Sequence, residues 1–231
     1  MTTLDSDRTP TSGAPSGNGS VPAARREQAA TPAPIVHRGW VYKAIMWFLV
    51  NPFYRLVYRV RIEGREHIPP GGALLAANHE SFLDIPLVSR AAAPRHVAFV
   101  ARDTLANASW LGFVMHHCGA ILVKRGASDR RALREMVAHL EAGDLVGVFP
   151  EGTRSRDGSL GPFKGGVLLA AKTARVPVVP VGIVGSYEAW PRDRKLPGRG
   201  RLIAHFGEPI AADEPGALER LRDAVESLSR S

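Results

Sequence analysis

The 231-residue chain has little of what marks secreted or membrane-spanning proteins. It contains one cysteine, Cys118, so no disulfide can form within it, and no cleavable signal-peptide pattern opens the sequence. The apolar run from Ala44 to Val50 is bounded by polar residues and is much shorter than the roughly twenty residues of a spanning helix. These absences argue against secretion and favour a reducing, cytoplasmic-side location.

An excess of acidic residues is also missing. The chain carries 30 Lys and Arg against 22 Asp and Glu, a formal net charge of +8, so its surface should attract nucleic acid, anionic lipid or phosphorylated substrates. None of the usual DNA- or RNA-binding motifs is present, and the cations cluster beside His, Asp and Glu at strand ends instead of forming one stripe. We therefore expect no nucleic-acid partner.

The N-terminal region divides into two segments of different composition. Residues 1–36 are rich in Ser, Thr, Pro, Ala and Gly without apolar periodicity, which predicts a disordered tail. Residues 37–60 are crowded with aromatics and carry Lys43, Arg55 and Arg59, a mixture that suits a helix or helical hairpin at the surface of an anionic membrane. We expect a peripheral or monotopic protein at the cytoplasmic face of the cell membrane. The alternative is a first core helix whose aromatics pack under a sheet.

Residues 61–231 alternate between strand and helix patterns and predict a single α/β domain. We expect strands at residues 73–77, 96–100, 120–123, 145–149, 178–184 and 202–206. Ser128 can cap an amphipathic helix that ends at Gly143, and a second, apolar helix should run from Val167 to Ala174. A last helix has four apolar residues on one face, Leu218, Leu221, Val225 and Leu228.

His79 and Asp84 follow the first of these strands, at the carboxyl end where sites of α/β proteins are usually built. Residues five apart lie about 140° apart around a continuous helix, so the two side chains meet only if His79 precedes the helix. A neutral imidazole held by a carboxylate is stabilised as it becomes cationic, which a general base for a hydroxyl requires. His139 and Asp144 form a second pair with this spacing. We expect His139 to lie on the surface of a helix and Asp144 at the start of a strand.

Cations beside two other strand ends form candidate anion sites. Residues 149–155 read Phe-Pro-Glu-Gly-Thr-Arg-Ser, and guanidinium forks with backbone N–H groups in a Gly-containing turn match a phosphate monoester. This makes Arg125, Arg154 and Lys124 candidate phosphate ligands, although each taken singly could be a solvated surface residue. Lys164 before two glycines at a helix start is a further candidate, or simply a Gly-rich helix start.

Together these segments resemble the lysophospholipid acyltransferase superfamily, specifically the 1-acylglycerol-3-phosphate acyltransferases. The resemblance covers roughly residues 60–210 and rests on four blocks. They are Asn78, His79 and Asp84; Gly119, Ile121, Val123 and Arg125; residues 149–155; and the Val-Pro-Val segment at 176–181. It implies a central, mostly parallel mixed sheet flanked by helices.

The resemblance also implies a reaction. The acceptor hydroxyl of a lysophospholipid attacks the thioester of acyl-coenzyme A or acyl carrier protein directly, with His79 as base and Asp84 as its orienter. No cofactor and no metal are implied. The chain has no Gly-x-Ser-x-Gly elbow, and neither Ser81 nor Cys118 sits in an activating arrangement, in agreement with the lack of an acyl-enzyme. The implied substrate-binding residues are Asn78, Ser81, Arg102, Lys124, Arg125, Glu151, Gly152, Thr153, Arg154 and Lys164.

One departure leaves the acceptor open. Position 124 is often acidic in the family and is Lys124 here, so the acceptor could be another lysolipid, glycerol 3-phosphate or a glycolipid instead of lysophosphatidic acid. A second alternative belongs to another class, a non-catalytic module that binds anionic lipid through its positive charge. Such a module would have no need of His79.

Overall fold

The computed structural model describes residues 39–104, 109–124 and 129–231. The expected disordered tail at residues 1–36 lies outside these ranges, as do Arg125 and Ser128.

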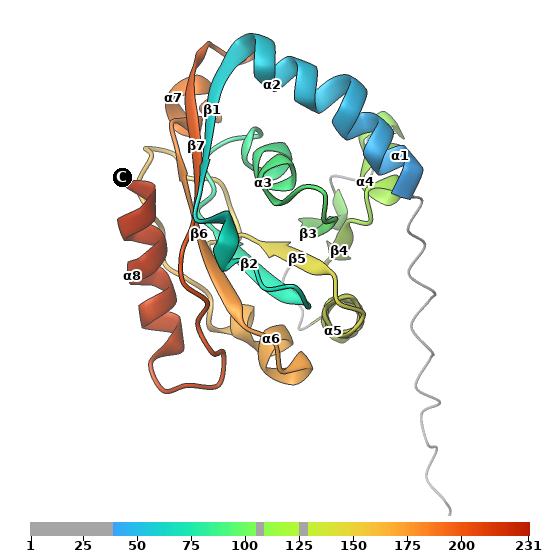
Figure 1. Ribbon diagram of the computed structural model, residues 1–231, viewed down its shortest axis with the longest axis vertical. Coiled ribbons are helices and arrows are strands. Elements are labelled where there is room, and N and C mark those ends of the chain that lie inside the picture. Colours follow the sequence, from blue (N-terminus) through green and yellow to red (C-terminus); the bar gives the residue numbers. More distant parts are fainter. Residues whose placement is uncertain (1–38, 105–108, 125–128) are drawn as a thin grey trace, which may run out of the picture. The chain divides into compact units, whose positions relative to one another are not determined.

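A seven-stranded sheet in the order β1-β7-β6-β2-β5-β3-β4 forms the centre of the described structure (Figure 1). Among its described pairings, β6 and β7 run antiparallel and the others are parallel, which confirms the mostly parallel mixed sheet. The strands are β1 (Tyr58–Glu63), β2 (Ala73–Ala77), β3 (Val97–Arg102), β4 (Ile121–Val123), β5 (Leu145–Val148), β6 (Val178–Val184) and β7 (Gly200–Phe206). Six of them lie where the sequence predicts them, within two residues at each end.

Helices cover both faces of the sheet, so its central strands are buried on both sides. Along β2, Ala73, Leu75 and Ala77 face one apolar cluster, and Leu74 and Ala76 face the other, as the two-residue period of a strand requires. The first cluster includes residues of α2 (Asn51–Val57) and α3 (Asp84–Ala92). The second includes residues of α5 (Arg130–Glu141), α6 (Leu169–Ala174) and α8 (Ala217–Ser229).

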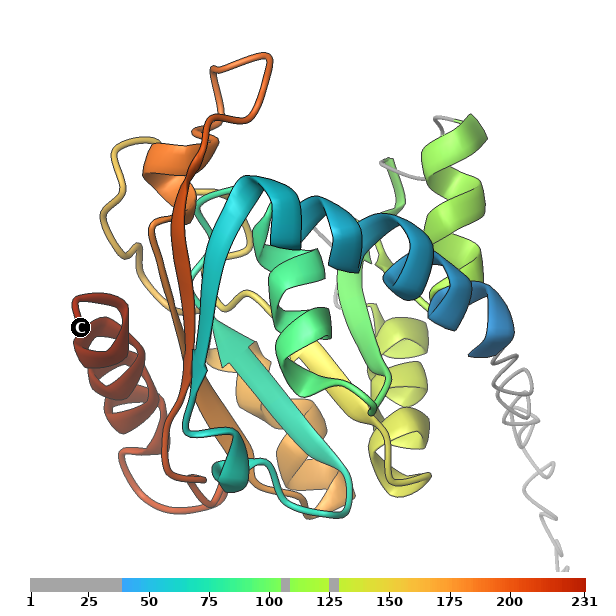
Figure 2. The same cartoon turned by 45° about the horizontal axis from the view of Figure 1, so that its top comes forward.

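The N-terminal segment is helical and continuous. α1 (Gly39–Ile45), a π-helical turn η1 (Met46–Val50) and α2 follow one another, and the residues at both junctions keep right-handed helical dihedral angles. The segment therefore forms one helical rod instead of a hairpin (Figure 2). Within the described residues, none of the helices combines the length and the apolar character needed to cross a membrane.

Strand β1 begins at Tyr58, within the last residues of the segment 37–60. This edge strand pairs in parallel with β7, from Tyr58 opposite Gly200 to Glu63 opposite His205. Its sequence, Tyr-Arg-Val-Arg-Ile-Glu, alternates apolar and charged residues, the pattern of a half-buried strand. This alternating pattern is short and directly follows the aromatic-rich helical segment, so the strand is hard to recognise from the sequence.

Helix ends differ from expectation at two places. α5 is capped by Asp129, whose Oδ1 accepts hydrogen bonds from the backbone N–H groups of Arg131 and Ala132, both at 3.1 Å. Aspartate is at least as good an N-cap as serine, so the shift by one residue is physically reasonable. The helix expected from Val167 is preceded by a 3₁₀ turn, η4 (Gly165–Leu168), and becomes α-helical only at Leu169. The remaining helices of the described ranges are η2 (Arg65–His67), α4 (Ser109–His117) and α7 (Ser186–Ala189).

Candidate active site

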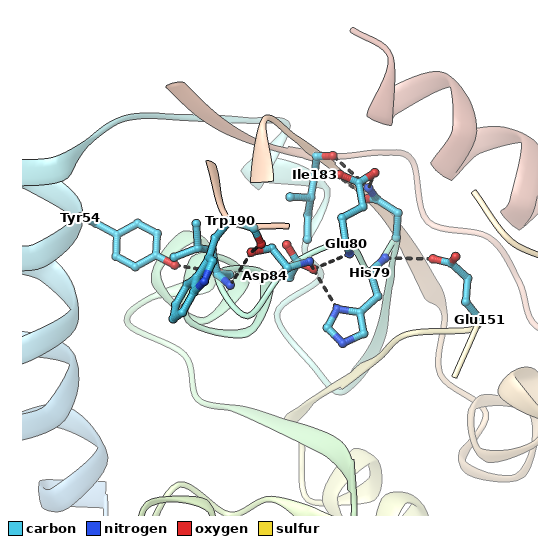
Figure 3. A network of polar contacts seen from close by, with 10 residues as sticks. Tyr54, His79, Glu80, Asp84, Glu151, Ile183 and Trp190 are labelled. Carbon is cyan, nitrogen blue, oxygen red and sulfur yellow. Dashed lines mark hydrogen bonds and ion pairs between the residues drawn. The ribbon is translucent and has the colours of Figure 1, made fainter. Parts of the chain in front are cut away.

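His79 and Asp84 meet at the carboxyl end of β2, where the chain turns into α3 (Figure 3). His79 Nδ1 lies 2.8 Å from Asp84 Oδ2, and the fully buried carboxylate accepts a hydrogen bond there. The same oxygen accepts from the backbone N–H groups of Glu80 and Ser81, each at 2.8 Å. One carboxylate oxygen thus shapes the turn and fixes the imidazole, because His79 precedes the helix as its spacing requires.

The orientation of the His79 ring is set from two sides. Asp84 accepts a hydrogen bond from Nδ1–H, so the neutral ring carries its lone pair on Nε2. The ring also stacks on Phe149, with centroids 3.8 Å apart and planes 14° apart. The imidazole side chain keeps 17% of its surface exposed, so part of the ring can be reached from solvent.

Glu151 joins the second motif to this turn. Its Oε1 accepts from the backbone N–H of His79 at 2.9 Å, and its Oε2 accepts from the backbone N–H of Gly161, also at 2.9 Å. Burial raises the pKa of this carboxyl, while the two backbone hydrogen bonds oppose that rise. The backbone N–H of Ser155 donates to His79 O at 2.7 Å. Residues 149–155 are therefore held directly against the histidine.

Asn78 and Ser81 use their side chains to hold backbone groups. Asn78 is buried, donates through Nδ2 to Ile183 O at 2.9 Å and accepts from Ile183 N at 2.7 Å. Ser81 is also buried, donates to Trp190 O at 2.8 Å and accepts from Leu83 N at 3.2 Å. In the structure both residues support the turn that carries His79.

Three of the expected cationic ligands gather around the loop of residues 149–155. Arg102, at the end of β3, donates from Nη2 to Gly152 O at 2.6 Å. Gly152 has φ of 68°, and a Cβ there would lie 2.4 Å from Nζ of Lys164. The Arg154 guanidinium lies over the Phe82 ring, 3.7 Å from its centroid. Burial lowers the pKa of Arg154 because it disfavours the charged form, and nearby cationic Arg192 lowers it further.

Two further expected ligands are exposed, Lys124 and Thr153. The backbone N–H of Lys124 donates to Asp129 Oδ2 at 3.2 Å, which ties this residue to the cap of α5. Arg125 lies outside the described residues.

Two residues of the site, Glu80 and Trp190, are not among those expected from the sequence. Glu80 accepts from Asn78 Nδ2 at 3.0 Å, and burial raises its pKa to about 7, with the charges of Asp84, Glu188 and Glu151 adding to the rise. Trp190 reaches the site from 109 positions beyond Ser81 and lies with its ring centroid 5.4 Å from that of Phe82. Nothing local in the sequence links residues so far apart.

The second pair, His139 and Asp144, also forms a hydrogen bond, with Nδ1 and Oδ2 3.0 Å apart. The expectation that His139 lies on the helix surface is wrong, because it faces inward from α5 and is only 4% exposed. Asp144 precedes β5 as expected, and its backbone oxygen accepts from Ala73 N at the start of β2. This pair therefore lies at the amino ends of the strands, whereas His79 lies at the carboxyl end of β2.

Comparisons with known proteins identify the family. The acyltransferase family model matches residues 59–184. A chloroplastic 1-acyl-sn-glycerol-3-phosphate acyltransferase of Arabidopsis thaliana is 33% identical over 76% of this chain and 49% of its own length. A lyso-ornithine lipid O-acyltransferase of Pseudomonas aeruginosa is 29% identical over 78% of this chain and 69% of its own.

The fold has a solved counterpart. The crystal structure of the 1-acyl-sn-glycerophosphate acyltransferase of Thermotoga maritima matches with a TM-score of 0.70 and 32% identity, over 84% of this chain and 78% of that one. The chain spans about half the length of the Arabidopsis relative. Since the family model covers more than half of its 231 residues, the chain belongs to the acyltransferase family.

Proposed function

We propose that this protein transfers a fatty acyl group from acyl-coenzyme A or acyl carrier protein to the sn-2 hydroxyl of 1-acyl-glycerol 3-phosphate, forming phosphatidic acid. The observation that carries the proposal is the His79–Asp84 pair, with its open Nε2 beside a cation-rich loop. The names of the Arabidopsis and Thermotoga relatives support this acceptor.

In the proposed reaction, His79 Nε2 removes the proton of the acceptor hydroxyl as its oxygen attacks the thioester carbonyl. The carbon–sulfur bond then breaks, and the imidazolium returns its proton to the leaving thiolate, so no covalent enzyme intermediate and no cofactor are needed. Asp84 stabilises the imidazolium through the 2.8 Å hydrogen bond to Nδ1. Positioned general bases of this kind contribute about 10²- to 10⁴-fold in rate.

The cations of the loop suit the phosphate of the acceptor. Arg154 stacks on Phe82, and its Nη1 has no hydrogen-bond partner among the described residues, so its positive charge lies beside this loop without a protein acceptor. Lys164 and Arg102 flank Gly152 and add positive charge to the same loop. In this proposal the phosphate takes a position between these groups.

The first test is transfer of a labelled acyl group to lysophosphatidic acid in mixed micelles, comparing wild type, His79→Ala and His139→Gln. We expect phosphatidic acid from wild type and His139→Gln, and a loss of about 10²-fold or more with His79→Ala. His139→Gln is the matched control because it alters the other His–Asp pair. Equal transfer by wild type and a folded His79→Ala would contradict the base assignment, whereas no transfer by folded wild type from either donor to any lysolipid would favour a lipid-binding module.

A second candidate acceptor is a zwitterionic lyso-aminolipid. Two observations favour it, the cationic Lys124 at a position that is often acidic in the family, and the similarity to the Pseudomonas enzyme. Competition between lysophosphatidic acid and lyso-ornithine lipid for one labelled donor separates the two. Preference for the lyso-ornithine lipid would replace the phosphatidic acid assignment and leave the chemistry at His79 unchanged.

The protein is further proposed to bind the membrane surface, on the cytoplasmic side, through the N-terminal helical rod. One face of the rod packs on the core, where Tyr54 donates to Leu83 O at 2.7 Å. The other face exposes Trp40, Trp47, Phe48, Leu49 and Leu56, between 66% and 83% of each residue. Exposed aromatic and aliphatic residues next to cations suit the headgroup region of an anionic bilayer.

Point substitutions test this membrane contact better than truncation, because removing residues up to Tyr58 would also remove the buried Tyr54. Trp47→Gln with Phe48→Gln keeps the inner face intact. We expect this variant to remain in the supernatant when anionic vesicles are sedimented, whereas wild type pellets with them. Unchanged sedimentation of the folded variant would refute the contact.

A further inference from the structure

The loop of residues 191–199, which joins α7 to β7, is the basic projection seen above the sheet in Figure 2. Residues 191–201 contain five cations against one acid, Asp193. The cations are Arg192, Arg194, Lys195, Arg199 and Arg201, all of them exposed. Between them Leu196 exposes 75% of its surface to solvent. An exposed apolar residue surrounded by cations matches the chemistry of a partner that is both anionic and apolar.

Hydrogen bonds across its base hold this loop in one shape. Gly198 N donates to Ala189 O at 2.7 Å, which closes the loop, and Arg194 N donates to Pro191 O at 3.2 Å. Trp190 Nε1 donates to Arg194 O at 2.9 Å. The exposed Leu196 therefore lies in a loop whose shape is fixed by these hydrogen bonds.

The loop lies beside the C-terminal end of the N-terminal helical rod. β1 and β7 start side by side, with Tyr58 opposite Gly200 and Arg59 opposite Arg201. Since α2 ends at Val57, its exposed Leu56 is close to the end of the loop. The end of the basic loop and the exposed Leu56 at the end of the rod are therefore close to one another.

The base of the loop is also part of the candidate active site. Trp190 O accepts the hydrogen bond from Ser81 Oγ, two residues after His79. The Trp190 ring lies next to Phe82, which is half exposed and carries the Arg154 guanidinium. A partner seated on the loop would therefore lie at the rim of the site.

We infer that the loop of residues 191–199 is a second membrane-binding element, which inserts Leu196 among the headgroups of an anionic bilayer. Its cations face the lipid phosphates, and Leu196 with Leu56 enters the acyl boundary. Contact at both the rod and the loop orients the site toward the bilayer, so that the hydroxyl of a lipid acceptor can approach His79 without leaving the interface. The functional part of this inference rests on the proposed lipid acceptor, while the binding part does not.

Flotation with vesicles of phosphatidylglycerol and phosphatidylcholine tests the binding part. Leu196→Gln removes the apolar side chain without a charge change, and Lys195→Gln with Arg199→Gln removes two cations. The matched controls are Leu169→Gln on α6, and Arg134→Gln with Lys172→Gln on α5 and α6, all exposed residues on the helices of the other sheet face. Thermal unfolding of every variant checks that each is folded.

We expect about tenfold weaker vesicle binding for Leu196→Gln and about 10- to 30-fold weaker binding for the double cation variant. The control variants should bind vesicles like wild type within about threefold, since the substituted residues lie away from the proposed membrane-binding loop. All variants should keep wild-type transfer in detergent micelles, where the acceptor needs no docking to a bilayer. Loss of transfer on vesicles alone would support the orienting role.

Two outcomes would overturn the inference. Vesicle binding by the loop variants equal to that of the matched controls would exclude a membrane contact at Leu196. Unchanged vesicle binding, with transfer lost only from acyl carrier protein and not from acyl-coenzyme A, would instead make the loop a docking surface for the acidic carrier protein. If wild type showed no transfer at all, the proposed function would fail while the flotation result would still decide the membrane contact.

Discussion

At the scale of single residues, Asp84 has three donors on one oxygen and none on the other. Oδ2 accepts from His79 Nδ1 and from two backbone N–H groups, whereas Oδ1 is buried without a hydrogen-bond partner among the described residues. An asparagine can place its oxygen at the Oδ2 position and keep all three contacts. The negative charge that stabilises the imidazolium would nevertheless be lost.

Asp84→Asn should therefore keep the fold and lower kcat for acyl transfer by about 10²- to 10⁴-fold, the range of a lost general base. Steady-state kinetics in mixed micelles measure this change. Asp144→Asn makes the same substitution in the His139 pair and should leave kcat within about twofold. A similar loss of kcat in both variants would mean that stability, and not the charge at His79, limits activity.

Glu80 should make the protein less stable as the pH rises through neutrality. Burial raises its pKa from 4.5 to about 7, so between these values the folded protein holds a proton that the unfolded chain releases. Stability attributable to this group is fully present below pH 4.5 and is lost as the pH approaches and passes about 7. The ionised carboxylate then costs about 1–2 kcal/mol, after a discount for solvent screening of a partly exposed group.

Glu80→Gln removes this titration and can keep an acceptor for Asn78 Nδ2. We expect urea unfolding to show the variant about 1–2 kcal/mol more stable than wild type at pH 8, with little difference at pH 4.5. An equal difference at both pH values would show that ionisation of Glu80 is not its cause.

At the scale of elements, α8 is packed closely against β6 at Gly182. A Cβ built on Gly182 would lie 2.4 Å from both the carbonyl carbon and the Cβ of Leu228, which leaves no room for any side chain. Gly182→Ala should therefore push the helix from the sheet and destabilise the protein by about 1–3 kcal/mol. Chemical denaturation measures the loss.

Gly166→Ala is the matched control, because a Cβ at Gly166 would meet nothing within 4 Å. It should leave the free energy of unfolding unchanged or raise it by up to about 1 kcal/mol, by restricting the unfolded chain. Equal losses from the two substitutions would contradict the close contact of α8 with β6.

Elements also differ in how far the sequence predicts them. The central strands have continuous apolar runs because they are buried on both faces, and these runs are visible without a structure. Edge strand β1 has the weaker alternating pattern and follows directly from a helix, so its identity depends on pairing with β7. The inward position of His139 likewise depends on how α5 lies against the sheet.

At the scale of the whole molecule, the formal net charge of +8 predicts binding to anionic membranes that depends on salt. The Debye length falls from about 10 Å at 0.1 M salt to about 3 Å at 1 M, so attraction between exposed cations and lipid phosphates is screened. We expect vesicle sedimentation to show at least about tenfold weaker binding at 1 M than at 0.1 M. Vesicles of phosphatidylcholine alone are the control, and equal salt dependence on them would exclude an electrostatic contribution.

The sequence by itself determined the α/β class, six of the strands and the turn in which His79 precedes Asp84. Each of these follows from local features: apolar periodicity, a helix start, and the fact that residues five apart cannot meet along one helix. Tertiary structure alone decided that Glu151 holds the His79 backbone and that Trp190 closes the site against Ser81. It also decided that the loop of residues 191–199 lies beside α2. These contacts join residues far apart along the chain, and only the packing of the sheet and its helices brings them within hydrogen-bonding distance.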